Sequence, residues 1–306
     1  MISIVIPLYN KALYIRRAVD SVLRQSVTNF ECIVVDDGST DGGGDIVAGI
    51  KDPRIRLIRQ PNSGVSVARN RGIEDAKHPL IAFLDADDEW LEGFLNTITD
   101  LFKQCPAAAL AGTAYKYSDL DAPCPAAQLL IKQGFQSGWL PNYFQIAPVG
   151  IPFCSSSVAI RRDALQLVAG FRNIWGGEDP DLWLRLGVGF RFAYSASVQA
   201  VYHRGMPTQY SNLNLPMPYP PAVESIINLD KAGKIPTEMR NDVLEYGNRL
   251  LLYYAEYLIG IGCLGEARTV LVKCQNTKRY QQLWRWAWWR TFVSRRFVRW
   301  LHRLRH

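Results

Sequence analysis

The chain has 306 residues, of which 48% are hydrophobic and 21% charged, and it contains 17 prolines and 23 glycines. This composition is typical of a folded globular protein and excludes collagen-like, low-complexity and fully disordered chains. The net charge of +7 arises at one end of the chain, because residues 268–306 hold eleven Lys and Arg and no acidic residue. The residues before 268 include 24 basic and 28 acidic ones, so their net charge is −4.

The first 110 residues alternate short apolar runs with amphipathic segments. The runs predict strands at 2–7, 31–36, 55–59 and 80–84, and the amphipathic segments predict helices at 14–24, just after residue 44, at 65–76 and at 90–103. The first run lacks the basic residues that begin a signal peptide, so it is predicted to be a strand. Strands that alternate with helices predict an α/β, Rossmann-like fold, with a mostly parallel central sheet flanked by helices and a site at the carboxyl ends of the strands.

The rest of the chain is less regular. Residues 118–150 are rich in Pro, Gly and Gln and have no period, which predicts a long loop, and a strand at 155–161 and a capped helix at 163–170 follow. Five prolines in 205–222 predict a linker, and 238–273 predicts a helical hairpin that breaks near 260–265. We therefore expect a domain over 1–205 with halves 1–110 and 111–205, a linker over 206–222, a C-terminal helical extension over 223–275 and a tail over 276–306.

Two of the predicted strands end in aspartates, in VVDDGSTD at 34–41 and FLDADD at 83–88. Carboxylates at the mouth of an apolar sheet are costly unless a divalent cation or the donors of a ligand neutralise them. Asp85 and Asp87 are spaced so that one metal ion can lie between them, and Mg²⁺ held in this way binds diphosphate oxygens. Taken alone, residues 37–45 are explained as well by a turn followed by a helix cap as by a metal or ligand site. An EF-hand is excluded because its twelfth position is Ala48 instead of Glu.

Six segments follow one another along residues 1–205: SIVIPLYN at 3–10, VVDDGSTDGG at 34–43, NSGVSVARNRGI at 62–73, FLDADDEW at 83–90, CSSSVAIRRDAL at 154–165 and GGEDPDLWLRL at 176–186. Together they resemble the family 2 glycosyltransferases of the GT-A fold. The resemblance implies that residues 1–110 bind a nucleoside-diphosphate sugar, with a UDP-sugar expected first, and that 111–205 bind a glycan or lipid-linked acceptor. It also implies a Mg²⁺ or Mn²⁺ ion bound by Asp87. The nucleotide pocket that it implies is formed by Pro7, Tyr9, Asp36, Asp37, Arg69, Asn70 and Asp85.

The resemblance further implies the catalytic residues. An inverting transfer needs a carboxylate that takes a proton from the acceptor hydroxyl, and Asp179 of the ED motif matches this general base, with Glu178 as its neighbour or as an acceptor-binding group. Asp179 before Pro180 is equally an ordinary helix N-cap, and the two roles are compatible. His203 stands where such enzymes often supply a further metal or diphosphate contact, although a histidine at a strand end is also commonly structural.

The segment from residue 284 onward is rich in Trp and Arg. On a helix, Trp286, Trp289, Phe297 and Trp300 share one stripe, and the arginines gather largely on the other side. This pattern predicts an interfacial helix on an anionic membrane surface. The arginines argue against a membrane span, because each one costs about 2.5–3.5 kcal/mol at the centre of a bilayer. The alternatives are a helix packed on the protein and a nucleic-acid contact. The sequence contains no recognised nucleic-acid-binding module, so no nucleic-acid partner is expected.

These features predict a metal-dependent hexosyl- or N-acetylhexosaminyl-transferase of surface glycan synthesis, such as that of lipopolysaccharide, capsule or exopolysaccharide. One rival is a nucleotide-sugar pyrophosphorylase or related nucleotidyltransferase, which would carry a Gly-rich loop where residues 7–10 read PLYN. Another is a non-catalytic, membrane-associated sugar-binding protein. The six cysteines form no CxxC pair and no run of about 18 apolar residues occurs, so we expect reduced thiols and a peripheral position on the cytoplasmic face of the inner membrane.

Overall fold

The computed structural model describes residues 1–204 and 216–292 of the chain. It divides into two compact units, Met1–Leu215 and Pro216–His306, and the division falls inside the linker predicted over 206–222. The first unit contains a nine-stranded sheet with its helices, and the helices α9 to α12 form the second.

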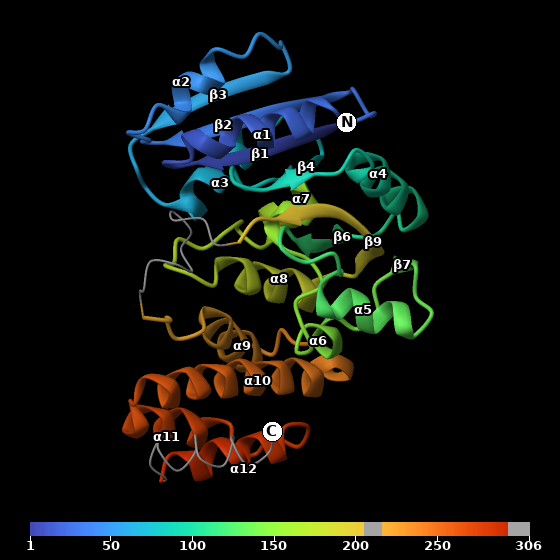
Figure 1. The fold of residues 1–306 in the computed structure, drawn as a ribbon. Coiled ribbons are helices and arrows are strands. Elements are labelled where there is room, and N and C mark those ends of the chain that lie inside the picture. The colour runs from blue at the N-terminus through green and yellow to red at the C-terminus, as the bar shows by residue number, and fades with distance from the viewer. Residues whose placement is uncertain (205–215, 293–306) are drawn as a thin grey trace. The chain divides into compact units, whose positions relative to one another are not determined.

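Four parallel strands form one half of the sheet. They are β1 (Ile2–Leu8), β2 (Phe30–Asp37), β3 (Ile55–Gln60) and β4 (Leu80–Phe83), in the order β3-β2-β1-β4 (Figure 1). The near-continuous apolar sequence of β1, which is buried along its whole length, is typical of a strand covered on both faces. The helices between these strands are α1 (Ala12–Leu23), α2 (Gly43–Ala48) and α3 (Val65–Asp75). Because the strands are parallel, the loops after β1, β2 and β4 lie at one edge of the sheet.

Helix α3 lies directly against β1. A Cβ atom added at Gly72 would stand 2.3 Å from Cγ1 of Val5, so only glycine allows this approach. Arg69 and Asn70 lie three and two residues earlier on the same helix, and the close packing therefore fixes the position from which they reach the site.

The sheet continues beyond β4 with shorter pairings. β8 (Val158–Arg161) pairs antiparallel with β4 and with β6 (Leu110–Tyr117), and β6 pairs parallel with β9 (Phe192–Tyr202). The edge strands β5 (Glu89–Trp90) and β7 (Ser137–Trp139) pair antiparallel with β9. The remaining helices of the unit are α4 (Phe94–Gln104), α5 (Pro125–Lys132), α6 (Tyr143–Ile146), α7 (Arg162–Leu167) and α8 (Glu178–Gly189). The long ladders are parallel and the antiparallel ones short, so the predicted α/β fold with a mostly parallel sheet is confirmed.

The helix predicted at 90–103 starts later than expected. Trp90 belongs to β5, where it is buried, and its indole Nε1 donates to the Ser156 carbonyl oxygen at 2.6 Å. Because this contact and the pairing with β9 hold Trp90 extended, α4 begins only at Phe94.

Two further predictions in this unit were wrong. Residues 118–150 are not one loop, because α5, β7 and α6 form there. The first turn of α5 contains a proline, which suits a helix start because the backbone amide that it lacks would have no partner within the helix. The strand predicted at 155–161 opens as a 3₁₀ turn, η1 (Ser155–Ser157), because serine side chains hydrogen-bond the nearby backbone before β8 begins.

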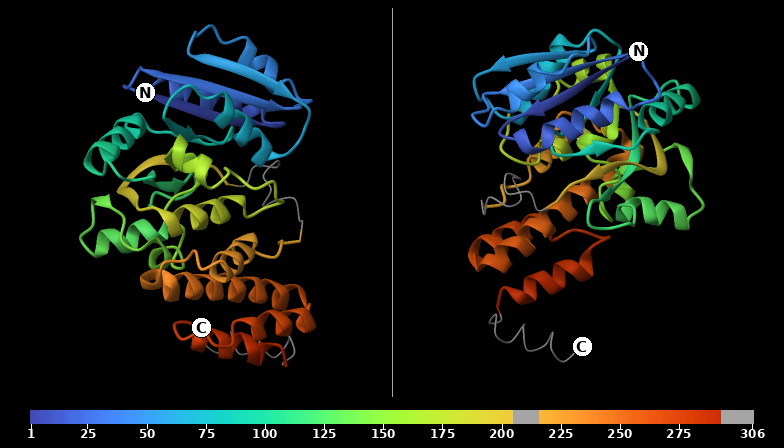
Figure 2. Two further views of the ribbon diagram at one scale, coloured as in Figure 1. Left: turned by 180° about the vertical axis from the view of Figure 1, so that it is seen from behind. Right: turned by 45° about the horizontal axis from the view of Figure 1, so that its top comes forward.

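The second unit consists of α9 (Pro221–Lys231), α10 (Thr237–Ile261), α11 (Leu264–Lys273) and α12 (Gln281–Arg290). α10 and α11 form the predicted hairpin, since Gly262 ends α10 with a left-handed φ of 93°. The two helices lie side by side in both views of Figure 2. They share with α12 a buried core that includes Leu252, Ala255, Ala267, Leu271 and Ala287. Within the two described ranges, no helix has both the length and the hydropathy to cross a bilayer.

Candidate active site

The loops after β1 and β2 are tied to each other. The Asn10 amide donates to Ser39 Oγ at 3.1 Å, and Asn10 Oδ1 accepts from the Thr40 amide at 2.8 Å. Pro7 is buried near the end of β1, whereas Tyr9 is 47% exposed, which leaves its ring accessible to a ligand.

Asp36 and Asp37 end β2 with both carboxylates engaged. Asp37 Oδ1 accepts from the Ser63 amide at 2.9 Å and from Gln60 Nε2 at 2.7 Å, and its Oδ2 accepts from the Gly64 amide at 2.8 Å. Asp36 Oδ1 accepts from a backbone amide of the turn that follows β2. Asp37 thereby shapes the loop before α3, and its contact with a nucleotide base stays a prediction.

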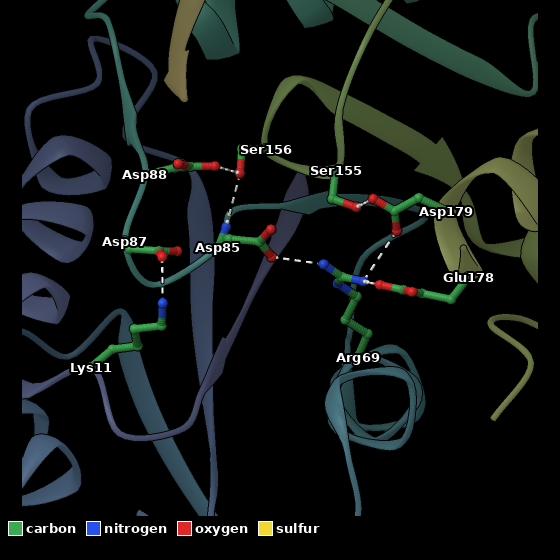
Figure 3. Close-up of polar contacts among 9 residues, drawn as sticks. All are labelled: Lys11, Arg69, Asp85, Asp87, Asp88, Ser155, Ser156, Glu178 and Asp179. Carbon is green, nitrogen blue, oxygen red and sulfur yellow. Dashed lines mark hydrogen bonds and ion pairs between the residues drawn. The ribbon is translucent and has the colours of Figure 1, made fainter. Parts of the chain in front are cut away.

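Arg69 joins three carboxylates from distant parts of the sequence (Figure 3). Its Nη1 donates to Glu178 Oε1 and to Asp179 Oδ1, each at 3.1 Å, and its Nη2 donates to Asp85 Oδ1 at 2.8 Å. The side chain is 3% exposed, and its guanidinium lies 5.1 Å from the ring centre of Phe171. Burial alone lowers the pKa of Arg69, but the three carboxylates, Asp85 first, raise it above its ordinary value. One cation therefore joins the loop after β4 to the start of α8.

Asn70, beside it on α3, supports this arrangement. Its Nδ2 donates to the Phe171 carbonyl oxygen at 2.7 Å, and its Oδ1 accepts from the Phe171 amide at 2.9 Å. Both polar ends of the amide are thus engaged in holding Phe171 next to Arg69.

Asp179 lies in the first turn of α8, whose N-cap is Gly177. The N-cap alternative for Asp179 is therefore wrong, because the helix already begins at Glu178 and the Asp179 carboxylate contacts other elements. Its Oδ2 accepts from Ser155 Oγ at 2.5 Å. Burial raises the pKa of Asp179 to about 7, against the opposing effect of Arg69. A carboxyl group with this pKa is partly ionised near neutral pH and can accept a proton there.

The loop at 85–88 concentrates negative charge. Asp87 forms an ion pair with Lys11. Asp88 is buried, and its Oδ2 accepts from Ser156 Oγ at 2.5 Å. Burial, and then the charges of the neighbouring aspartates, raise the pKa of Asp88 well above its ordinary value. Three carboxyl groups therefore crowd this loop, and among the described ion pairs only Asp85 and Asp87 have a cationic partner.

His203 follows β9 near the same loop. Its amide donates to Asp88 Oδ1 at 2.9 Å, and its Nε2 lies 2.9 Å from Glu89 Oε1. The two predicted metal ligands, His203 and Asp87, thus have different partners. Across residues 1–204 and 216–292, no three His, Cys, Asp or Glu side chains form a metal-holding group. The acidic loop still fits a hard cation, because Mg²⁺ is typically bound by one or two carboxylates together with phosphate oxygens and water.

Four residues of the site were not expected from the sequence: Lys11, Asp88, Ser155 and Ser156. The third aspartate of FLDADD and the serine run of CSSS were visible signals, but neither shows its partner. Lys11 lies 76 positions from Asp87 and Ser156 lies 68 positions from Asp88, whereas Ser155 lies 24 positions from Asp179.

The tryptophans of α12 divide into two pairs. Trp284 and Trp288 pack against the core of the second unit, with ring centroids 5.4 Å apart. Trp286 and Trp289 stack at 5.1 Å, and Trp289 is 37% exposed. The other two predicted membrane-contacting residues, Phe297 and Trp300, lie outside the described residues.

Known proteins share this fold. TarS residues 1–349 of S. aureus, in complex with UDP-GlcNAc, superpose with a TM-score of 0.70 at 16% identity, over 94% of this chain and 79% of TarS. The mannosyltransferase PcManGT of Pyrobaculum calidifontis, in complex with GDP-Man and Mn²⁺, gives 0.61 at 16% identity, over 95% and 84% of the two chains. The predicted GT-A fold is thereby confirmed.

Sequence relatives point the same way. Glycosyltransferase GlyG of Streptococcus pneumoniae is 36% identical over 124 residues, which are 40% of this chain and 41% of GlyG. An uncharacterized glycosyltransferase of Rickettsia bellii is 29% identical over 215 residues, 70% of this chain, and the match spans only 30% of that relative. The family described as glycosyl transferase family 2 matches residues 3–168, more than half of the chain. The chain therefore belongs to glycosyltransferase family 2.

Proposed function

We propose that this glycosyltransferase moves a hexosyl or N-acetylhexosaminyl group from a nucleoside-diphosphate sugar to an acceptor hydroxyl, with inversion at the anomeric carbon. The Arg69 network carries the proposal, because one guanidinium joins Asp85, assigned to the donor, with Asp179, assigned to the acceptor. A UDP-sugar is the first candidate donor, supported by the UDP-GlcNAc complex of TarS.

Asp179 is the proposed base. As the acceptor oxygen attacks the anomeric carbon, Asp179 takes the hydroxyl proton, and the bond from that carbon to the diphosphate oxygen breaks with its electron pair. Arg69 and Ser155 hold one carboxylate oxygen each. Glu178, on the same guanidinium, is the proposed partner for an acceptor hydroxyl.

The loop after β4 would receive the leaving group. Asp87, with His203 as a second candidate, would hold Mg²⁺ or Mn²⁺, which when bound neutralises the charge that develops on the departing diphosphate. Lys11 pairs with Asp87, and the Arg17 guanidinium donates to the Asp87 carbonyl oxygen, so further positive charge lies at the same place. The Mn²⁺ in the PcManGT complex supports a divalent ion. Tyr9 and the loop held by Asp37 are proposed to receive the nucleotide base.

The acceptor is proposed to be a glycan or lipid-linked hydroxyl used in surface glycan synthesis on the cytoplasmic face of the inner membrane. Support comes from α12, where the stacked pair Trp286 and Trp289 accompanies Arg285 and Arg290. Aromatic rings beside arginines suit the headgroup region of an anionic bilayer.

The donor site is tested by calorimetric binding of UDP, GDP, dTDP and CMP, with and without Mn²⁺. Wild type should bind one of them in a Mn²⁺-dependent manner, and Asp87→Ala should lose this binding. Asp100→Ala is the matched control, because it removes a carboxylate that is 70% exposed and pairs only with Lys103 among its described contacts. Binding that survives in Asp87→Ala removes the metal assignment.

The base is tested by Asp179→Asn, which keeps the size of the side chain. This variant should bind the nucleotide normally and transfer about 10²–10⁴-fold more slowly. Proton NMR of the wild-type product gives the anomeric configuration of the new glycosidic bond, which is compared with that of the donor. Undiminished transfer by Asp179→Asn, or a retained configuration, would overturn the proposed mechanism.

A further inference from the structure

The turn η1 (Ser155–Ser157) contacts the proposed base and the donor-side loop with consecutive residues (Figure 3). Ser155 Oγ donates to Asp179 Oδ2 at 2.5 Å. Ser156 Oγ donates to Asp88 Oδ2 at 2.5 Å and accepts from the Asp85 amide at 3.1 Å. Each serine is 1% exposed, so these hydroxyls are committed to protein partners instead of water.

The turn is itself firmly held. Ser157 Oγ accepts from the Cys154 amide at 3.0 Å and donates to the Cys154 carbonyl oxygen at 3.2 Å, which closes the turn on itself. The Ser156 carbonyl oxygen accepts from Trp90 Nε1. The turn then runs into β8, which pairs with β4, the strand that leads to Asp85. Ser155 and Ser156 therefore project from a rigid support in the middle of the sheet.

The charges around Asp179 make the Ser155 contact important. Asp179 faces the Arg69 guanidinium from α3, Glu178 on its own helix, Asp85 after β4 and the Cys154 thiol before η1. The Arg69 Nη1 is shared between Oδ1 of Asp179 and Glu178, whereas Oδ2 of Asp179 accepts from Ser155. A hydroxyl that donates to a carboxylate favours its ionised form and fixes its orientation.

We propose that Ser155 is a positioning residue, which orients Asp179 and favours the ionised form that accepts the acceptor proton, while Ser156 holds the donor-side loop in register with it. The inference rests on the proposed role of Asp179 as base. It assigns a task to the serine run at 155–157, which lies outside the acidic motifs.

The test compares Ser155→Ala with Ser157→Ala, a neighbour in the same turn whose hydroxyl contacts only Cys154 among the described hydrogen bonds. Ser155→Ala should lower kcat about ten- to a hundredfold, the effect of one hydrogen bond to a charged group. The donor KM and the nucleotide Kd should stay at their wild-type values, and the midpoint of the kcat–pH profile should move to higher pH. Ser157→Ala should keep the wild-type midpoint even if it melts earlier.

Ser155→Cys serves as a second variant, because it nearly keeps the size and donates more weakly. It should lie between wild type and Ser155→Ala in kcat and in midpoint. A wild-type profile in both Ser155 variants, or an equal shift in Ser157→Ala, overturns the inference. If Asp179→Asn transfers at the wild-type rate, the base assignment itself fails, whereas an inactive Asp179→Asn beside normal Ser155 variants refutes only the positioning role.

Discussion

Arg69→Ala removes the cation that three carboxylates share. The guanidinium is 3% exposed and contacts Asp85 at 2.8 Å and Glu178 and Asp179 at 3.1 Å each. Breaking a buried ion pair by removal of one partner costs about 3–5 kcal/mol, because the remaining charge stays buried without compensation. We therefore expect the free energy of unfolding to fall by about 3–5 kcal/mol at pH 8.

The deficit should depend on pH. Arg69 lowers the pKa of Asp179, so its removal raises that pKa further above about 7, away from the ordinary value of 3.8. An acid whose pKa is higher in the folded than in the unfolded state favours folding at low pH, and this contribution is lost as the pH rises through the folded pKa. The variant should therefore be closer to wild type at pH 5 than at pH 8.

Urea unfolding at the two pH values measures this. Arg69→Lys should lie between wild type and Arg69→Ala, because an ammonium group lacks the planar fork that reaches three carboxylates. Arg71→Ala, on the same helix, removes a half-exposed pair with Asp75 and should change stability by less than about 1 kcal/mol at either pH. A deficit in Arg69→Ala that is the same at pH 5 and pH 8, or no larger than that of Arg71→Ala, would refute the reasoning.

Three other outcomes are expected. The wild-type transfer rate at saturating donor should rise with pH through a midpoint of about 7, because Asp179 must be ionised to accept the proton. A transfer rate that does not change between pH 5.5 and pH 8.5 would contradict this. Gly72→Ala should cost about 1–3 kcal/mol in thermal unfolding, since its Cβ would overlap Val5, whereas Gly265→Ala on α11, with no neighbour within 4 Å, should cost nothing. Trp289→Ala should weaken sedimentation with phosphatidylglycerol vesicles and lower Tm less than Trp288→Ala, which loses packing against the core of the second unit. Equal vesicle binding by Trp289→Ala and wild type would remove the surface role.

The parallel half of the fold was predictable because buried parallel strands are continuous apolar runs. The strand predicted at 2–7 is β1 to within one residue, and α3 differs from its predicted range by one residue. β5 and β7 are two and three residues long, too short to show a period, and both depend on β9 as a partner. β6 was not predicted, and β9 was anticipated only as a strand that ends near His203, although β8 pairs with β6.

The acidic residues of the site were likewise visible in the sequence, whereas their partners were not. Asp85 and Asp179 stand out because carboxylates at element ends demand neutralisation, but Arg69 lies 110 positions from Asp179. The contact of Ser155 with Asp179 depends on where the turn before β8 falls, and that is set by the pairing of β8 with β4. Such distances follow from register and packing, which a single sequence does not contain.

The donor-side acids also influence the base, and this gives a test with an unusual sign. The charge of Asp85 raises the pKa of Asp179, and Asp85 competes with it for Arg69. Asp85→Asn removes that charge and leaves the guanidinium to Asp179 and Glu178, so the midpoint of the kcat–pH profile at saturating donor should move to lower pH. Ser155→Ala should move the same midpoint to higher pH. If both substitutions moved it in one direction, Asp179 would not be the group that titrates, because its two neighbours act on it with opposite sign.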